Sequence, residues 1–215
     1  MTVEAKICGL NTPESVTAAV EGGAAYVGFV FYPPSPRAVD ADQAAALARL
    51  VPEGVARVGL FVDMGDAAME AILGPVPLDL LQLHGAETPE RVAAIRQRTG
   101  IPVMKAVRIA GAGDVAEAAR FASACDRILF DAKPPADMKG ALPGGNALAF
   151  DWRLIAGQAW SVPWMLSGGL DAGNVAEAVR VSGARAVDVS SGVETRPGVK
   201  DVARIGAFLD AVRTL

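Results

Sequence analysis

The sequence predicts a closed (β/α)8 barrel of eight parallel strands, on three observations. Eight short runs rich in Val, Ile, Leu and Phe recur along the 215 residues, and each precedes a segment with the helical spacing of Ala and Leu. Strand and helix therefore alternate, which favours parallel strands joined by right-handed crossovers. Eight such units of roughly 27 residues favour a small TIM barrel over an open, doubly wound sheet.

The elements follow one another in regular order. The expected strands are 3–8, 26–31, 55–62, 78–84, 102–109, 127–131, 162–167 and 185–190. The expected helices are 13–23, 40–51, 66–74, 88–100, 113–124, 151–158, 171–183 and 199–213. Several helices have Pro or Asp at the start and Gly at the end, as helix caps prefer. The sixth unit is irregular, because a loop rich in Pro and Gly stands where its helix would begin. No linker divides the chain, so we expect one domain over 1–215.

Composition excludes several classes of protein. The net charge is −4, and no basic run could follow a phosphate backbone, so nucleic acid is not an expected partner. No apolar run reaches the roughly 18 to 20 residues of a membrane helix, and the N-terminus does not resemble a signal peptide. The two cysteines, Cys8 and Cys125, lack the spacing of a metal site or a disulfide framework. We expect reduced thiols, no metal and a cytoplasmic protein.

Polar residues stand where the expected strands end, which is where barrels of this kind carry their chemistry. In chain order they are Cys8, Arg37, Asp63, His84, Arg108, Asp131, the "SGG" turn at 167–169, and Asp188 with the "SSG" turn after it. Their common phase favours one active site at this end of the barrel.

The last two strand ends predict a phosphate site. The candidates are Gly168, Gly169, Ser190, Ser191 and Gly192. Their small turns expose backbone N–H groups, and the loops after strands seven and eight commonly bind phosphate in such barrels. Alternatively the glycines satisfy turn geometry and the serines cap a helix. Because the two turns occur together at these places, we favour a phosphorylated ligand, such as a phosphosugar.

Cys8 and Asp131 are the candidates for proton transfer. Alternation along the first strand points Lys6 and Cys8 into the barrel, where the ammonium group would increase the ionised fraction of the thiol. Asp131 ends a buried strand, and a carboxyl group that burial keeps protonated can act as a general acid. The alternatives are a small buried hydrophobe for Cys8, which is our interpretation of Cys125, and a helix cap for Asp131. A thiolate facing an acid suits a general base better than a covalent nucleophile.

Arg37 and His84 are weaker candidates. Arg37 follows a stiff "PPSP" segment, and its guanidinium fork suits a carboxylate on the ligand. A lone arginine in a loop is otherwise often a solvated charge. His84 is the only histidine, and we expect it to line the site rather than to catalyse.

Seven motifs in this order resemble the phosphoribosylanthranilate isomerase family of tryptophan biosynthesis. They are "KICGL" at 6–10, "GFVFYPPSPR" at 28–37, "LLQLHG" at 80–85, "ILFDAK" at 128–133, "GGNALAFDW" at 144–152, "LSGGL" at 166–170 and "DVSSGVE" at 188–194. The resemblance spans nearly the whole chain and implies a cofactor-free Amadori rearrangement by an aldose–ketose isomerase. It makes Cys8 the general base and Asp131 the general acid. Arg37 would then bind the anthranilate carboxylate, and the two turns would bind the phosphate. We also expect His84 and Asp188 to bind the substrate.

One departure and several alternatives stand beside this resemblance. Ala147 occupies a position where the family pattern suggests glycine, so a positive φ there would force the loop of the sixth unit to bend differently. The alternatives are another phosphosugar isomerase, including one of the histidine-pathway type with aspartate in place of Cys8, and a Schiff-base aldolase using Lys105 or Lys133. A non-catalytic phosphate-ligand sensor is the last. The expected partner is a small phosphosugar-anthranilate substrate, bound by a monomer or a homodimer.

Overall fold

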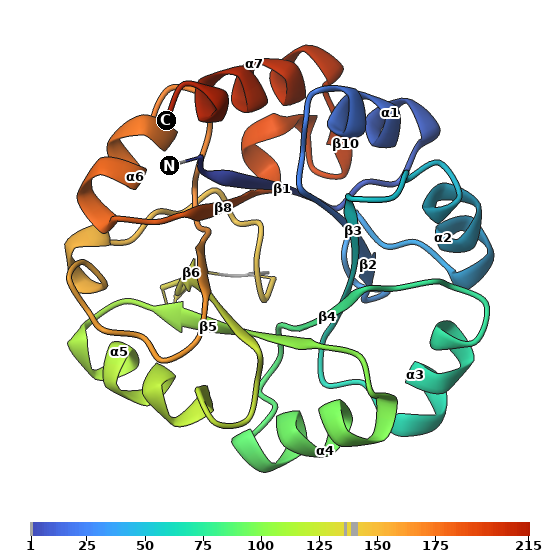
Figure 1. Cartoon of the computed structure of the whole chain (residues 1–215), viewed down its shortest axis with the longest axis horizontal. Coiled ribbons are helices and arrows are strands. Elements are labelled where there is room, and N and C mark those ends of the chain that lie inside the picture. Colours follow the sequence, from blue (N-terminus) through green and yellow to red (C-terminus); the bar gives the residue numbers. More distant parts are fainter. Residues whose placement is uncertain (1, 136, 139–141) are drawn as a thin grey trace.

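Eight parallel strands close into a barrel in chain order, as the sequence predicts. The computed structural model describes residues 2–135, 137, 138 and 142–215. Figure 1 looks down the barrel axis, with the helices surrounding the strands. The strands are β1 (Glu4–Cys8), β2 (Tyr26–Phe31), β3 (Ala56–Phe61), β4 (Leu80–Leu83), β5 (Val103–Ile109), β6 (Arg127–Ala132), β7 (Trp164–Leu166) and β8 (Ala186–Val189).

The helices begin and end close to the predicted caps. They are α1 (Pro13–Glu21), α2 (Ala41–Ala48), α3 (Asp66–Leu73), α4 (Pro89–Thr99), α5 (Ala112–Ala118), α6 (Val175–Ser182) and α7 (Val202–Arg213), and a 3₁₀ turn, η1 (Ala119–Phe121), extends α5. The side chains of Thr12, Thr88 and Asp201 accept hydrogen bonds from the first turns of α1, α4 and α7. Gly100 and Gly183 end α4 and α6 in the left-handed conformation.

Two predicted helices are wrong in whole or in part. Instead of a helix over 151–158 there is a single 3₁₀ turn, η2 (Trp152–Leu154). Asp151 caps that turn through Arg153, and Gly157 soon takes a φ of +69°, so the helix does not propagate. The predicted helix 199–213 starts only at Val202. The residues before it form an unpredicted antiparallel hairpin of β9 (Glu194–Arg196) and β10 (Val199–Lys200), which follows a 3₁₀ turn, η3 (Ser191–Val193).

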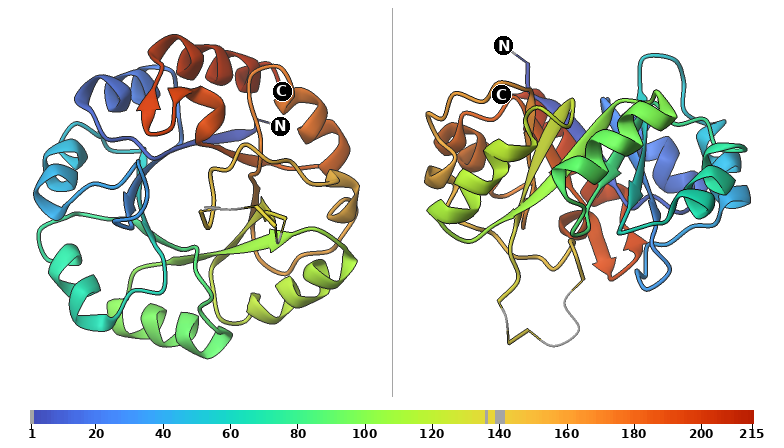
Figure 2. Two further views of the ribbon diagram at one scale, coloured as in Figure 1. Left: turned by 180° about the vertical axis from the view of Figure 1, so that it is seen from behind. Right: turned by 90° about the horizontal axis from the view of Figure 1, so that it is seen from below.

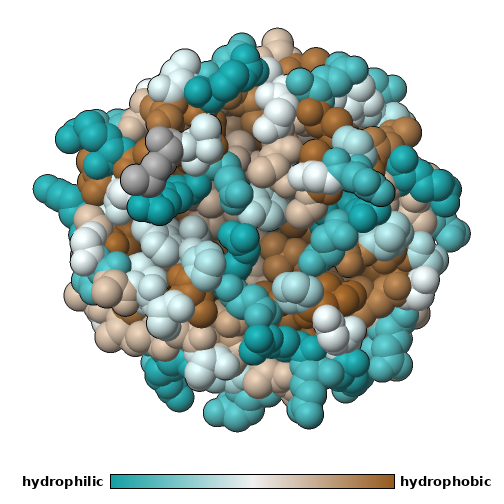
Figure 3. Space-filling model, in the orientation of Figure 1, coloured by the Kyte–Doolittle hydropathy of each residue, from teal (hydrophilic) through white to brown (hydrophobic). Residues whose placement is uncertain are grey.

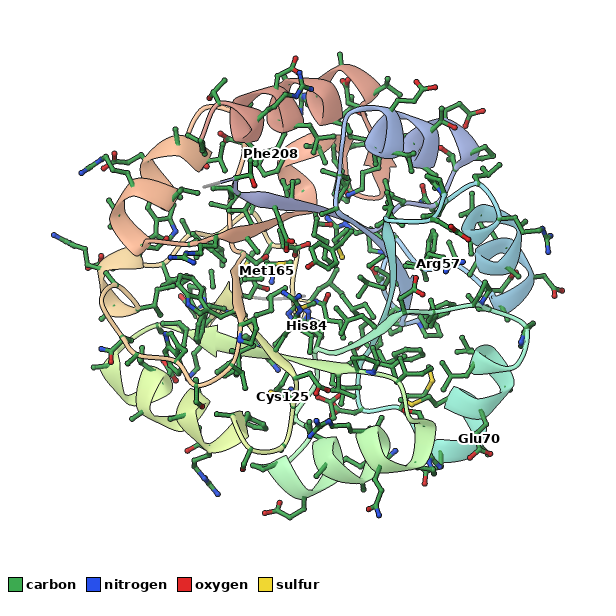
Figure 4. All side chains as sticks on the ribbon, in the orientation of Figure 1. Arg57, Glu70, His84, Cys125, Met165 and Phe208 are labelled. Atoms are coloured by element: carbon green, nitrogen blue, oxygen red, sulfur yellow. The ribbon has the colours of Figure 1, made fainter. Side chains whose placement is uncertain are left out.

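The core has an inner and an outer layer, because successive strand residues face opposite sides. Inside the barrel lies a small apolar cluster, which includes Met104 and Met165. A larger cluster fills the space between strands and helices. Figure 4 shows Met165 within the ring of strands, Phe208 beneath α7 and Cys125 outside the ring. Cys125 is a buried member of the outer core, which confirms its interpretation as a small hydrophobe.

The two ends of the barrel differ. In Figure 2 the N- and C-termini lie at one end, whereas the loop after β6 and the β9–β10 hairpin project from the other. The view down the axis in Figure 3 shows hydrophilic side chains around the rim and apolar patches between them. Within the described ranges, no helix combines the length and apolar character that crossing a membrane requires.

Candidate active site

A pocket opens at the carboxyl ends of the strands. The predicted site residues that line it are Cys8, Arg37, His84, Asp131, Gly168, Gly169, Asp188, Ser190 and Ser191. Gly192 does not line the cavity, and neither do Asp63 and Arg108, which also stand at strand ends. Parallel strands with a common side-chain phase thus bring nine of the ten predicted site residues to one place.

Cys8 faces the cavity above a buried ion pair. Lys6, two residues earlier on β1, has no exposed surface, and its Nζ lies 2.8 Å from Oδ1 of Asp188 on β8. Burial raises the pKa of the Cys8 thiol, Asp188 raises it further, and the ammonium groups of Lys6 and Lys200 oppose the rise without cancelling it. Lys6 acts in the predicted direction, since its ammonium group lowers the pKa of Cys8, but desolvation outweighs this effect and the pKa is raised on balance.

Asp188 lines the cavity with both carboxylate oxygens engaged. Oδ1 accepts from Lys6, and Oδ2 accepts from the hydroxyl of Ser167 at 3.0 Å. The carboxylate also keeps the pKa of Lys6 above its ordinary value, although burial alone would lower it. The Asp188 carboxylate thus balances the positive charge of Lys6 beneath Cys8. A ligand that donates a hydrogen bond to this carboxylate would share it with Lys6 and Ser167.

Asp131 and His84 form a buried contact across β6 and β4. Nε2 of His84 lies 3.1 Å from Oδ2 of Asp131, and Oδ1 accepts from the backbone N–H of Ala132 at 2.9 Å. On the other side of the ring, the Nδ1 atom of His84 contacts the side-chain amide of Gln82, whose Nε2 lies 2.9 Å away. The sequence prediction did not include Gln82, although its place two residues before His84 gives both side chains the same phase on β4.

Arg37 is a buried member of an ion-pair network. Its Nε and Nη2 donate to the two carboxylate oxygens of Glu194 at 2.7 and 2.8 Å. Nη2 also lies 3.3 Å from the carbonyl oxygen of Gly145. The sequence predicted a guanidinium open to the ligand, whereas the fork is engaged by Glu194. Among the described residues, Nη1 has no hydrogen-bond partner.

The loop after β6 covers the site. Residues 142–148 line the cavity, and a Cβ on Gly144 would lie 2.8 Å from Oδ2 of Asp131. Only glycine permits so close an approach. Ala147 takes a φ of +55°, so the alanine itself adopts the left-handed conformation. Ala147 thus takes the positive φ without being glycine, and it lines the cavity with the rest of the loop.

The turns after β7 and β8 have the geometry of an anion site. Gly168 and Gly169 have φ of +89° and +63°. Within the described part of the chain, the backbone N–H groups of Gly169, Ser191 and Gly192 donate to no acceptor. Gly192 is needed for close packing, because a Cβ there would lie 2.0 Å from the carbonyl oxygen of Leu170.

Neither lysine of the aldolase alternative reaches the cavity. Lys105 faces the outer layer, where its Nζ lies 2.7 Å from Glu87 and 5.7 Å from the centre of the Phe121 ring. Lys133 is half exposed and pairs with Asp114. The residues described include no cluster of three or more His, Cys, Asp or Glu suited to a metal ion.

Glu194 and Lys200 are the charged residues that the sequence prediction missed. Lys200 donates to Glu194 at 2.8 Å, and both side chains are buried beside Arg37. Glu194 is the last residue of the motif "DVSSGVE", and its place shortly after a polar turn could have identified it as a site residue. No sequence feature identifies Lys200, because it stands within a segment with helical spacing.

Fold and cavity together define the class of this protein. It is a (β/α)8 barrel with a small-molecule cavity at the carboxyl ends of its strands, in which a thiol and a carboxyl group face the same space. Comparison with known proteins gives the family. Residues 5–211 match the model of N-(5'-phosphoribosyl)anthranilate (PRA) isomerase, and the chain belongs to this family.

Individual relatives agree along the full length. The chain is 62% identical over 215 residues to N-(5'-phosphoribosyl)anthranilate isomerase of Rhodospirillum centenum, covering all of both chains. It is 56% identical to the enzyme of Paramagnetospirillum magneticum, over 99% of this chain and 98% of the relative. The crystal structure of the Thermotoga maritima enzyme superposes with a TM-score of 0.87 at 37% identity, covering both chains fully. A second crystal structure, at 36% identity and a TM-score of 0.86, is a complex with reduced 1-(o-carboxyphenylamino)-1-deoxyribulose 5-phosphate and also covers both chains fully.

Proposed function

We propose that this chain is a phosphoribosylanthranilate isomerase that converts N-(5-phosphoribosyl)anthranilate to 1-(2-carboxyphenylamino)-1-deoxyribulose 5-phosphate. The observation that carries the proposal is the presence of Cys8 and Asp131 in one cavity, on β1 and β6. Family membership agrees with it, since the relatives bear the name of this enzyme. We propose the whole chain as one catalytic domain. A cytoplasmic location and a monomeric or homodimeric state stay predictions from the sequence.

The ligand's two charged ends have candidate sites. The free N–H groups of Gly169, Ser191 and Gly192 suit the phosphate, because backbone donors on small turns match an anion. The anthranilate carboxylate would take Nη1 of Arg37. With its two ends bound in this way, the sugar would lie between them, in the cavity that Cys8 and Asp131 line.

The proposed reaction transfers protons and leaves the ligand's composition unchanged. Asp131 gives its proton to the furanose ring oxygen, the ring C–O bond breaks, and the anthranilate nitrogen forms an iminium ion. The Cys8 thiolate takes the proton from C2′, and the electron pair of that C–H bond forms the enolamine. Tautomerisation of the enolamine gives the ketone product. No cofactor is required, since each step moves a proton between the substrate and a side chain and an electron pair within the substrate.

The test is turnover of phosphoribosylanthranilate, followed by the loss of its fluorescence. Each general acid–base step contributes roughly 10² to 10⁴ in rate, so Cys8→Ser and Asp131→Asn should each lower kcat at least that much. Binding of the reduced product analogue should survive both changes. Cys125→Ser is the matched control, because that thiol lies in the outer core. Near-normal turnover in the Cys8 or Asp131 variant would remove that residue from the mechanism.

A further inference from the structure

The β9–β10 hairpin contacts the residues proposed for both charged ends of the ligand. It begins with Glu194, directly after the turn that carries Ser190 and Ser191, and it ends with Lys200. In Figure 2 it projects from the same end of the barrel as the loop after β6. The catalytic proposal gives the hairpin no role.

Glu194 fixes the orientation of Arg37. The two side chains form a bidentate pair in which Nε and Nη2 of Arg37 donate to Oε1 and Oε2 at 2.7 and 2.8 Å. Arg37 is also confined by two glycines, since a Cβ on Gly9 would lie 2.7 Å from its Cδ and one on Gly145 would lie 2.6 Å from its Nη1. A planar guanidinium bound through its Nε–Nη2 edge has one orientation, and Arg37 in that orientation lines the cavity.

Lys200 connects this pair to the predicted phosphate turn. Its Nζ lies 2.8 Å from Oε1 of Glu194, 2.8 Å from the carbonyl oxygen of Ser190 and 3.3 Å from the Ser190 hydroxyl. The same hydroxyl donates to the carbonyl oxygen of Cys8 at 3.1 Å. All three donor positions of the ammonium group are therefore used, and its side chain is 1% exposed.

The tip of the hairpin packs against the loop that carries Arg37. Gly198 has a φ of +81°, and a Cβ there would lie 2.3 Å from the carbonyl oxygen of Pro36. Asn11 donates to the carbonyl oxygen of Gly198 at 3.0 Å. Although burial alone would raise it, hydrogen bonds from Arg37 and Lys200 keep the pKa of Glu194 below its ordinary value. The carboxylate is therefore the charged centre of a buried network.

We propose that Glu194 and Lys200 are positioning residues of the active site, with Glu194 orienting Arg37 toward the ligand carboxylate and Lys200 fixing Ser190 beside the ligand phosphate. The inference rests on the proposed function, which assigns those two ends. Neither side chain touches the reacting atoms. Each acts through a residue that contacts the ligand, so their loss should affect binding more than chemistry.

Two variants with separate probes test the inference. Glu194→Gln keeps the shape and removes the charge, and Lys200→Met leaves a balanced Arg37–Glu194 pair. Arg196→Gln is the control, because Arg196 is exposed on the same hairpin. Each full-length variant is titrated with anthranilate alone and with inorganic phosphate alone. Misplacing a binding group lowers affinity on the order of tenfold or more. Glu194→Gln should therefore lower the affinity for anthranilate about tenfold and leave the affinity for phosphate unchanged. Lys200→Met should lower the affinity for phosphate about tenfold and leave the affinity for anthranilate unchanged.

Kinetics give a second readout. In both variants KM for phosphoribosylanthranilate should rise about tenfold while kcat falls less, and Arg196→Gln should match the wild type. Two outcomes would overturn the inference. One is an equal loss of affinity for both probes together with a lower unfolding midpoint, and the other is an unchanged affinity for both probes. If one variant does not fold, the other still tests its own half. An inactive wild type would instead refute the proposed function, and the two titrations would then decide the inference without turnover.

Discussion

Nε2 of His84 lies 3.1 Å from Oδ2 of Asp131, while the side-chain amide of Gln82 lies 2.9 Å from Nδ1 of the same ring. The imidazole ring therefore bridges Gln82 and Asp131. In a neutral ring one nitrogen donates and the other accepts, so the tautomer decides which of the two contacts the ring donates to. Among the described residues Oε1 of Gln82 has no hydrogen-bond partner.

His84→Asn should lower kcat by about fivefold to a hundredfold, because leaving the buried Asp131 side chain without this hydrogen-bond partner costs about 1–3 kcal/mol. That loss is smaller than the loss expected for Asp131→Asn. The measurement is steady-state turnover of phosphoribosylanthranilate. An unchanged kcat in the variant would contradict this account.

The ionisation of Cys8 should respond to the charges around it in a defined direction. The groups that act on it are Lys6 on its own strand, Asp188 on β8 and Lys200 on β10. Removing the negative charge in Asp188→Asn favours the thiolate, so the pKa of Cys8 should fall, and removing the positive charge in Lys200→Met should raise it. The measurement is the pH dependence of alkylation in a Cys125→Ala background.

The expected order of alkylation rates near pH 8 is Asp188→Asn first, the parent next and Lys200→Met last. The parent should also titrate above the ordinary value of about 8.5, because burial dominates. The Cys125→Ala background is needed only for clarity, since burial raises the pKa of that second thiol to about 11. Identical midpoints in the three proteins would show that these charges do not act on Cys8.

The barrel could be predicted from the sequence because each element is specified locally. An apolar run of strand length followed by a capped helix needs no partner to be recognised, and the right-handed crossover rule then determines the order of the strands. The segment 151–158 shows where this fails. Its apolar spacing is helical, but Asp151 caps a single 3₁₀ turn. Gly157, three residues after that turn, has a positive φ and stops a helix from continuing. In short segments, single contacts of this kind determine whether a helix or a turn forms, because a short helix is only marginally stable.

The location of the site could be predicted from the sequence, but the ion pairs within it could not. Side-chain phase along a strand brings Cys8, His84 and Asp131 to one cavity, and this phase is visible in the sequence. The partner of Arg37 is not, because Glu194 lies 157 residues away. The pKa of Cys8 depends on how far desolvation outweighs Lys6, and that balance follows from burial in the folded protein. Distant pairing and desolvation are properties of the assembled barrel.

Ala147→Gly should stabilise the protein slightly. The alanine has a φ of +55°, and the left-handed conformation costs a residue with a Cβ about 1–2 kcal/mol, which the greater chain entropy of unfolded glycine offsets in part. The expected gain in the free energy of unfolding is about 0.5–1 kcal/mol, measured by denaturant unfolding. Because Ala147 lines the cavity, KM should be measured alongside. A loss of stability would mean that the alanine side chain contributes packing that outweighs its strain.

Gly192→Ala should destabilise the protein and impair ligand binding together. The new Cβ would lie 2.0 Å from the carbonyl oxygen of Leu170, and a backbone atom cannot move aside as a flexible side chain can. Overpacking of this kind costs about 1–3 kcal/mol, and the turn after β8 must shift away from the turn after β7. Because both turns are proposed to bind the phosphate, KM should rise as well.

Gly206→Ala is the matched control for this glycine. Gly206 lies within α7, and a Cβ there meets nothing within 4 Å. Alanine is the better helix former by about 0.5–1 kcal/mol, so this variant should be more stable than the wild type with unchanged kinetics. Denaturant midpoints and steady-state kinetics of the two variants therefore separate a steric effect at the site from a general effect of replacing glycine. If Gly192→Ala kept both wild-type stability and KM, the close approach of the two turns would not matter for binding.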